Sequence, residues 1–210
     1  MSEIATDTGL LRGPLRKRES SLWARHPEDW YVEPSWCSER LFDIERFEGN
    51  ICDPAMGQGH ITLAAFNRGH ETHGLDVVAR NPHWPPLHVM DWLAYDGQPF
   101  DNIVSNPPFK LCDDRKAGRY PFVEQCLKYS RRKVALLMPA NWVQGDDRSR
   151  WLETTPLRKV LFITPRPSMP PGDALAAGMK PGNGTTDYAW FIWLHGFDGR
   201  AEIGWLRRKP

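Results

Sequence analysis

The stretch Asp53-Pro54-Ala55-Met56-Gly57-Gln58-Gly59 follows a short run at residues 49–52 and precedes residues 61–66, whose apolar side chains fall at helical spacing. This order predicts a strand, a glycine turn and a helix. Gly57 and Gly59 suit such a turn, because a residue without a Cβ atom takes positive φ readily and lets the backbone approach a ligand held over the first turn of the helix. The sequence therefore predicts a βα unit with a ligand site at its turn.

A second predicted strand, residues 71–77, brings Asp76 to its carboxyl end. Asp76 follows the glycine turn by about twenty residues, the spacing at which a carboxylate receives ribose hydroxyls in βαβ nucleotide sites. A glycine turn after a strand is also ordinary loop chemistry, so the turn alone does not establish a nucleotide site. The order of turn and carboxylate favours the nucleotide site.

The segment Asn106-Pro107-Pro108-Phe109 ends another predicted strand, residues 100–105. Asn before Pro also starts turns, and a Pro-Pro pair stiffens loops, so a structural role is an alternative. The chemical interpretation is that an aromatic amine is a poor nucleophile until its N–H groups donate to fixed acceptors. The Asn106 side-chain oxygen and a prolyl carbonyl would be those acceptors, and Phe109 would stack on the base. Such a site needs no metal ion.

These segments resemble those of class I S-adenosylmethionine-dependent methyltransferases of the N6-adenine group, the small phage-type and orphan DNA methyltransferases in particular. The resemblance extends from about Tyr31 to about His195. It implies a Rossmann-like α/β fold with a mostly parallel seven-stranded sheet and helices on both faces. Alternating strands and helices along the chain also predict a mostly parallel covered sheet; the resemblance adds that the last predicted strand, residues 188–194, runs antiparallel.

The resemblance also implies roles for individual residues. The glycine turn would hold the methionine end of S-adenosylmethionine, Asp76 its ribose, and Asp91 with Trp92 its adenine. A segment that begins at Tyr31 would close over the methionine end, although Glu33 stands where Thr is common in the family. The residues expected at the cofactor are Tyr31, Glu33, Asp53, Ala55, Gly57, Gly59, Asp76, Val77, Asp91, Trp92 and Asn106. Asn106, Pro107, Pro108 and Phe109 are expected to be catalytic.

Two segments, residues 110–119 and 164–186, have no sustained periodicity. Both are expected to be irregular and to follow strands on the active-site side. Long irregular loops in compact domains are often functional, so these are candidates for contact with nucleic acid, with a mobile lid or plain disorder as alternatives. The expected substrate contacts are Phe109, Lys110, Trp142 and Arg166.

Composition is consistent with one domain at residues 24–210, preceded by a flexible basic arm at residues 1–23, and leaves no room for a separate target-recognition domain. The four cysteines form no close pair and no CxxC, so neither a disulfide framework nor a zinc site is expected. No signal core or membrane-length apolar run occurs, which predicts a soluble cytoplasmic protein. The net charge of +1 is a mild argument against nucleic acid, but the basic residues are clustered.

The function expected from the sequence is S-adenosylmethionine-dependent methylation of adenine N6 in nucleic acid, with DNA favoured over RNA. Three alternatives stay open. The first is an RNA adenine-N6 or guanine-N2 methyltransferase, because the tetrapeptide also serves other planar amines. The second is a protein-glutamine methyltransferase, although such enzymes usually have Tyr at the fourth position and a distinct amino-terminal domain. The third is an inactive cofactor-binding partner subunit. The sequence predicts no oligomeric state.

Overall fold

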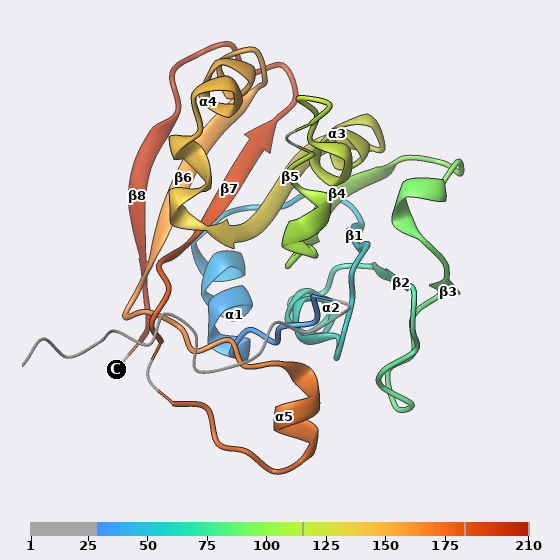
Figure 1. The fold of residues 1–210 in the computed structure, drawn as a ribbon. Coiled ribbons are helices and arrows are strands. Elements are labelled where there is room, and N and C mark those ends of the chain that lie inside the picture. Colours follow the sequence, from blue (N-terminus) through green and yellow to red (C-terminus); the bar gives the residue numbers. More distant parts are fainter. Residues whose placement is uncertain (1–28, 115, 183, 210) are drawn as a thin grey trace, which may run out of the picture.

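One eight-stranded sheet organises the chain in the computed structural model, which describes residues 29–114, 116–182 and 184–209 (Figure 1). The expected arm at residues 1–23 lies outside these ranges. From one edge to the other, the strands are β3 (His88–Val89), β2 (Thr72–Asp76), β1 (Ile51–Asp53), β4 (Phe100–Ser105), β5 (Ser130–Pro139), β7 (Tyr188–Leu194), β6 (Leu157–Thr164) and β8 (Glu202–Arg207).

All strands except β7 run in the same direction. β7 pairs antiparallel with both β5 and β6, whereas the other pairs are parallel. The mostly parallel sheet and the antiparallel strand at residues 188–194 are therefore confirmed. The expected number of seven strands is wrong, because β8 adds an eighth along the free side of β6. Gly204 interrupts the apolar pattern of β8, and Gly is depleted in strands, so its sequence signal is weak.

Helices cover both faces of the sheet. On one face, α1 (Ser35–Ile44) and α2 (His60–Phe66) contribute Cys37, Leu41 and Ile61 to a buried cluster. On the other face, α3 (Pro121–Lys128) and α4 (Asp146–Glu153) contribute Phe122 and Leu152 to a second cluster. None of the helices in the described ranges is long and apolar enough to span a bilayer.

The central strands are apolar at consecutive positions because alternate side chains enter different clusters. In β5, Val134 and Leu136 pack with α3 and α4, while Ala135 and Leu137 pack with α1 and α2. Trp193 and Trp190 in β7 divide in the same way, and both are fully buried. These two tryptophans therefore build the core.

Within the described part of the chain, three short 3-10 helices lie between the strands and the longer helices: η1 (Trp92–Ala94), η2 (Phe109–Leu111) and η3 (Ala140–Gln144). The expectation that residues 110–119 are wholly irregular is wrong, since they begin in η2 and an isolated bridge joins Asp114 to Arg119.

Residues 164–186 also contain regular structure, contrary to expectation. A short helix, α5 (Gly172–Ala176), lies in this segment, at the lower edge of Figure 1. The Val32 N–H donates to the Pro170 carbonyl over 3.1 Å, and the Gly172 N–H donates to the Trp30 carbonyl over 3.1 Å. These long-range bonds hold residues 30–32 in place, and no local sequence pattern encodes them.

Candidate active site

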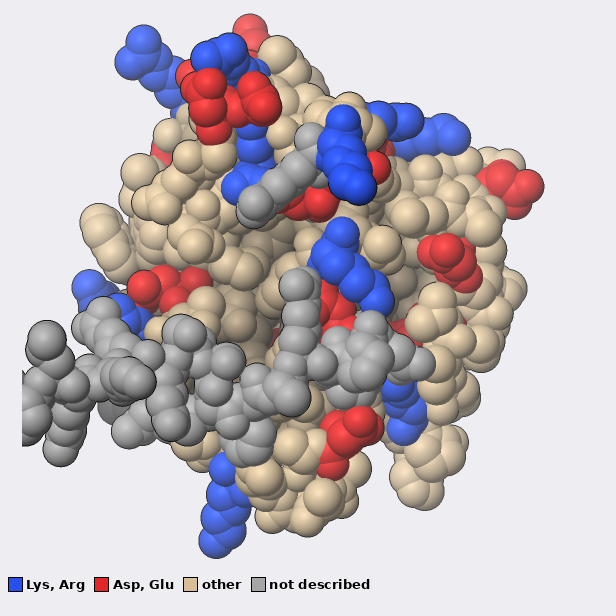
Figure 2. Space-filling view, viewed as in Figure 1, with Lys and Arg blue, Asp and Glu red and all other residues tan. Residues whose placement is uncertain are grey.

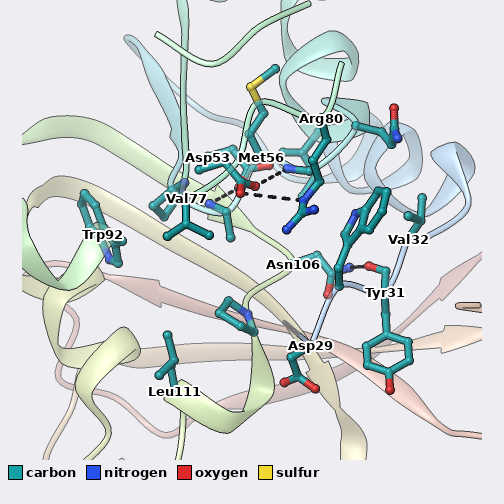
Figure 3. A pocket seen from close by; sticks show the side chains of 18 of the residues that line it. Asp29, Tyr31, Val32, Asp53, Met56, Val77, Arg80, Trp92, Asn106 and Leu111 are labelled. Atoms are coloured by element: carbon teal, nitrogen blue, oxygen red, sulfur yellow. Dashed lines mark hydrogen bonds and ion pairs between the residues drawn. The ribbon is translucent and has the colours of Figure 1, made fainter. Parts of the chain in front are cut away.

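A cavity of about 220 Å³ lies where β1, β2 and β4 end (Figure 3). Its lining brings together ten of the residues expected at the cofactor: Tyr31, Glu33, Asp53, Ala55, Gly57, Asp76, Val77, Asp91, Trp92 and Asn106. Pro108 and Lys110 also line it. The remaining expected residue, Gly59, does not line the cavity but forms the N-cap of α2. In Figure 3, Arg80 and Asn106 point toward the middle of this cavity, and Trp92 lies at one side of it.

The glycine turn has the backbone conformation expected of it. Gly57 has φ of 53° and Gly59 has φ of 84°, both in the left-handed region. A Cβ atom on Gly59 would lie 2.7 Å from Cδ1 of Trp84 and 2.9 Å from Cε of Met56. Both the backbone angle and the close packing therefore require glycine at position 59, whereas at Gly57 the backbone borders the cavity itself.

Asp76 ends β2 and binds the glycine turn. Its Oδ2 accepts from the Gly57 N–H over 2.8 Å, and its Oδ1 accepts from the Val78 N–H over 3.0 Å. The Nε atom of Arg80 lies 3.9 Å from Oδ1. Asp91, the next carboxylate along the cavity wall, accepts from the Leu93 N–H over 2.9 Å and so caps η1. Each carboxylate is thus held in one orientation by backbone donors.

Four buried carboxyl groups, those of Asp29, Glu33, Asp53 and Asp76, make this cavity acidic. Burial raises the pKa of Asp53 well above its ordinary value, although the Ser105 hydroxyl donates to it over 2.7 Å. Burial also raises the pKa of Glu33. A bound cation would lower the cost of ionising these groups, so the cavity suits a cationic ligand better than an anionic one.

The orientation of the Asn106 amide follows from its two acceptors. Nδ2 donates to the Tyr31 carbonyl over 2.9 Å and to Oε2 of Glu33 over 2.8 Å. The Tyr31 carbonyl can only accept, and so can Glu33 when it is ionised, so the amino group faces both. Oδ1 has no hydrogen-bond donor among the residues that the structure describes. Asn106 therefore presents a fixed acceptor at the carboxyl end of β4.

The tetrapeptide that begins at Asn106 lies between two cavities. Asn106 and Pro108 line the first one, whereas Phe109 lines a second cavity of about 350 Å³ together with Trp142 and Arg148. The Pro108 carbonyl accepts from the Leu111 N–H over 2.9 Å. The ring of Phe109 lies 6.1 Å from that of Tyr188, measured between centroids. A planar group held beside Phe109 would thus adjoin the cavity of the glycine turn.

The structure does not gather all the expected substrate contacts into one place. Trp142 lines the second cavity but is buried against Tyr120 and Phe191, so much of its ring packs in the core. Arg166 lines a third cavity of about 800 Å³, and its Nε pairs with Oδ1 of Asp187 over 2.5 Å. The Lys110 side chain is exposed, and its backbone N–H donates to Asp29 over 2.9 Å.

Sequence reasoning missed several residues of the first cavity. The guanidinium of Arg80 lies 4.3 Å from the ring centroid of Trp30, and both residues line the cavity. His60, the first residue of α2, places Nδ1 2.9 Å from the Glu33 carbonyl. The only sequence signal for these residues was their proximity to expected site residues. Trp30 directly precedes Tyr31, and Arg80 follows Asp76 by four positions.

No protein-family model matches the chain, and no curated protein matches it. Solved structures do. The M protein of the type I restriction enzyme EcoKI is 13% identical with a TM-score of 0.55, and the match covers 86% of this chain and 49% of that one. A second structure is that of a protein from Listeria monocytogenes assigned as a candidate class I S-adenosylmethionine-dependent methyltransferase. It is 15% identical with a TM-score of 0.51, and the match covers 82% of this chain and 62% of that one.

A third similar structure is magnesium protoporphyrin IX methyltransferase from Synechocystis, solved with bound S-adenosylmethionine. It is 10% identical with a TM-score of 0.50, and the match covers 74% of each chain. The chain thus spans about three fifths of the Listeria protein and about half of the EcoKI subunit. At these identities the likeness concerns the fold: this chain has the Rossmann-like fold of class I methyltransferases.

Proposed function

We propose that this chain is an S-adenosylmethionine-dependent methyltransferase that modifies the N6 amine of adenine in DNA. The observation that carries the proposal is the position of Asn106, which lines the same cavity as the glycine turn and has its amide oxygen unengaged by the described residues. Fold and cavity together support methyl transfer in general. The tetrapeptide supports a planar amine as the acceptor.

The residues that line the first cavity match the groups of S-adenosylmethionine. Asp76 and Asp91 would receive ribose and adenine groups, Trp92 would pack on the adenine, and the turn at Gly57 leaves backbone space for the methionine end. The buried carboxyl groups suit a ligand that carries a sulfonium charge. When bound, this cofactor supplies an electrophilic methyl group.

Asn106 and the prolines would prepare the acceptor amine. Oδ1 of Asn106 would accept one N–H of the amine, and the carbonyl of Pro107 would accept the other. The Pro108 carbonyl is the less suitable acceptor, because it already bonds to the Leu111 N–H. Phe109 would stack on the base from the second cavity. Positioning of this kind accounts for most of the rate enhancement that the site would provide.

The second and third cavities would receive the rest of the substrate. Asn141 and Gln144, both in η3, line the two cavities in common, and Trp205 on β8 lines the third with 62% of its surface exposed. Amides can read base edges, and an exposed indole can stack on a base. A target base in duplex DNA would have to leave the stack to reach Asn106, at a cost of a few kcal/mol.

The charge distribution suits local phosphate contacts. On the face that Figure 2 displays, Lys and Arg side chains are interspersed with Asp and Glu. A surface with interspersed charges would make a few phosphate contacts at defined positions. The affinity for DNA would depend on salt concentration through those contacts. The EcoKI subunit with which the chain shares its fold is an N6-adenine DNA methyltransferase, which is compatible with DNA as the substrate.

The test is to incubate the purified full chain with methyl-labelled S-adenosylmethionine and separate pools of DNA, RNA and protein, and to identify the product by mass spectrometry. N6-methyladenine in DNA is the expected product, and Asn106→Ala should remove most turnover while cofactor affinity stays near the parent value. If the methyl label appears in RNA or in protein glutamine instead, the substrate is not DNA and the proposal must be changed accordingly. A folded, cofactor-binding Asn106→Ala protein that methylates at the parent rate would refute the amine chemistry.

A further inference from the structure

Glu33 lines the first cavity, stands where Thr is common in the family that the sequence resembles, and forms a hydrogen bond with Asn106. Its side chain is buried, with 7% of the residue exposed, and Oε2 accepts from Nδ2 of Asn106 over 2.8 Å. Glu33 belongs to residues 30–34, which are distant in sequence from Asn106 at the end of β4. The hydrogen bond from the Val32 N–H to the Pro170 carbonyl holds this segment in place.

The two acceptors that face Asn106 restrict the orientation of its side-chain amide. An asparagine amide can turn by 180° with little change in shape, which exchanges Oδ1 and Nδ2. The turned orientation would place Oδ1 against two oxygens, the Tyr31 carbonyl and the Glu33 carboxylate. An ionised carboxylate opposes that arrangement more strongly than a neutral acceptor, because its hydrogen bond to an amide is stronger.

We propose that Glu33 is a positioning residue that holds the Asn106 amide with Oδ1 toward the acceptor amine. The inference rests on the proposed function for its effect on turnover, whereas the amide orientation itself can be measured without any substrate. The hydrogen bond from Nδ2 of Asn106 to Oε2 of Glu33 is the contact through which Glu33 would act.

The proposal predicts a dependence on the ionisation of Glu33. A protonated carboxyl could donate to Oδ1 and would therefore tolerate the turned amide, whereas the carboxylate would not. The titratable groups that influence Glu33 lie on three elements packed around it: His60 on α2, Asp53 on β1 and Cys37 on α1. Burial raises the pKa of Glu33, and a protonated His60 would lower it. Turnover should therefore fall as the pH falls through the raised pKa of Glu33.

The first experiment compares Glu33→Gln with Glu33→Ala in single-turnover methylation of DNA across pH, with cofactor affinity and melting temperature measured on each. Gln keeps an oxygen that accepts from Nδ2 but, like the protonated carboxyl, could also donate to Oδ1. We therefore expect Glu33→Gln to be slower than the ionised parent, to retain at least about a tenth of the parent rate, and to lose the acidic limb of the pH profile that Glu33 causes. Ala removes the acceptor, and we expect its single-turnover rate at saturating cofactor to be at least about tenfold below that of Gln.

The second experiment observes the Asn106 side-chain amide by NMR, with its signals assigned by their loss in Asn106→Ala. In the parent protein these signals should shift with pH as Glu33 ionises, and the shift should vanish in Glu33→Gln, which also covers the case in which Glu33→Ala does not fold. Equal loss of activity in Gln and Ala would make Glu33 a general base and overturn the proposal. A parent-like rate in Ala, or amide signals insensitive to Glu33, would also overturn it. If the amide behaves as expected but no DNA is methylated, the proposed function falls and the positioning role stands.

Discussion

The backbone N–H of Gly57 donates to Oδ2 of Asp76 over 2.8 Å, so the turn after β1 is bonded directly to the carboxylate that ends β2. The two residues lie 19 positions apart in the sequence. Parallel pairing of β1 with β2 brings their carboxyl ends to one edge of the sheet, which makes this bond possible. Asp76 therefore shapes the glycine turn as well as offering acceptors to a ligand.

Asp76→Ala should weaken S-adenosylmethionine binding by about 1 to 3 kcal/mol, because it removes the proposed ribose acceptor. It should also lower stability, since the N–H groups of Gly57 and Val78 lose their partner. Asp76→Asn keeps an oxygen acceptor and should bind more tightly than the Ala variant. Isothermal calorimetry on the three proteins measures the difference, and unchanged affinity in Asp76→Ala would exclude Asp76 from the cofactor site.

Gly57→Val should weaken cofactor binding more than the matched variant Gly69→Val. Both glycines have positive φ, 53° and 82°, so both variants should lose stability through backbone strain. Only Gly57 lines the first cavity, and a Cβ on Gly69 would meet no atom within 4 Å. Melting temperature and calorimetric affinity separate strain from lost cofactor space. Similar affinities in the two variants would argue against a ligand at Gly57.

Phe109→Ala should reduce both substrate capture and the single-turnover rate, since it removes the stacking surface, at about 1 to 3 kcal/mol for one base. Phe109→Tyr retains an aromatic face and should keep much of the activity. The ring of Phe109 also packs near Tyr188, so melting temperatures are needed as a control for stability. If both variants are destabilised alike and neither loses methyl transfer selectively, the tetrapeptide is a structural turn.

Arg166→Ala should lower the slope of log affinity for DNA against log salt by about one, the effect of losing one phosphate contact. Arg131→Ala is the matched control. Both arginines are exposed and paired with an aspartate, but Arg131 lies near the start of β5, whereas Arg166 follows the end of β6 on the side of the proposed site. Equal salt slopes in the two variants would remove Arg166 from the nucleic-acid interface.

Local sequence patterns predicted the parts of the fold that depend on short stretches of chain. The glycine turn and the apolar runs of β4, β5 and β7 were identified because buried strands and βα turns leave a continuous signal of a few residues. The strand at residues 202–207 and the helix at residues 172–176 were missed, because Gly204 interrupts one pattern and prolines surround the other. Their structure depends on pairing with β6 and on contacts with residues 30–32.

The sequence by itself determined the order of the βα units and the two short segments at which chemistry was expected, because residue type and spacing suffice to encode turns and strand ends. Only the tertiary structure decided that Glu33 holds Asn106 and that Arg80 lies over Trp30, since these pairs come from different elements. It also divided the expected substrate contacts among separate cavities, leaving Trp142 in the core. Side-chain burial and long-range hydrogen bonds depend on how the strands are ordered across the sheet, which no local pattern specifies.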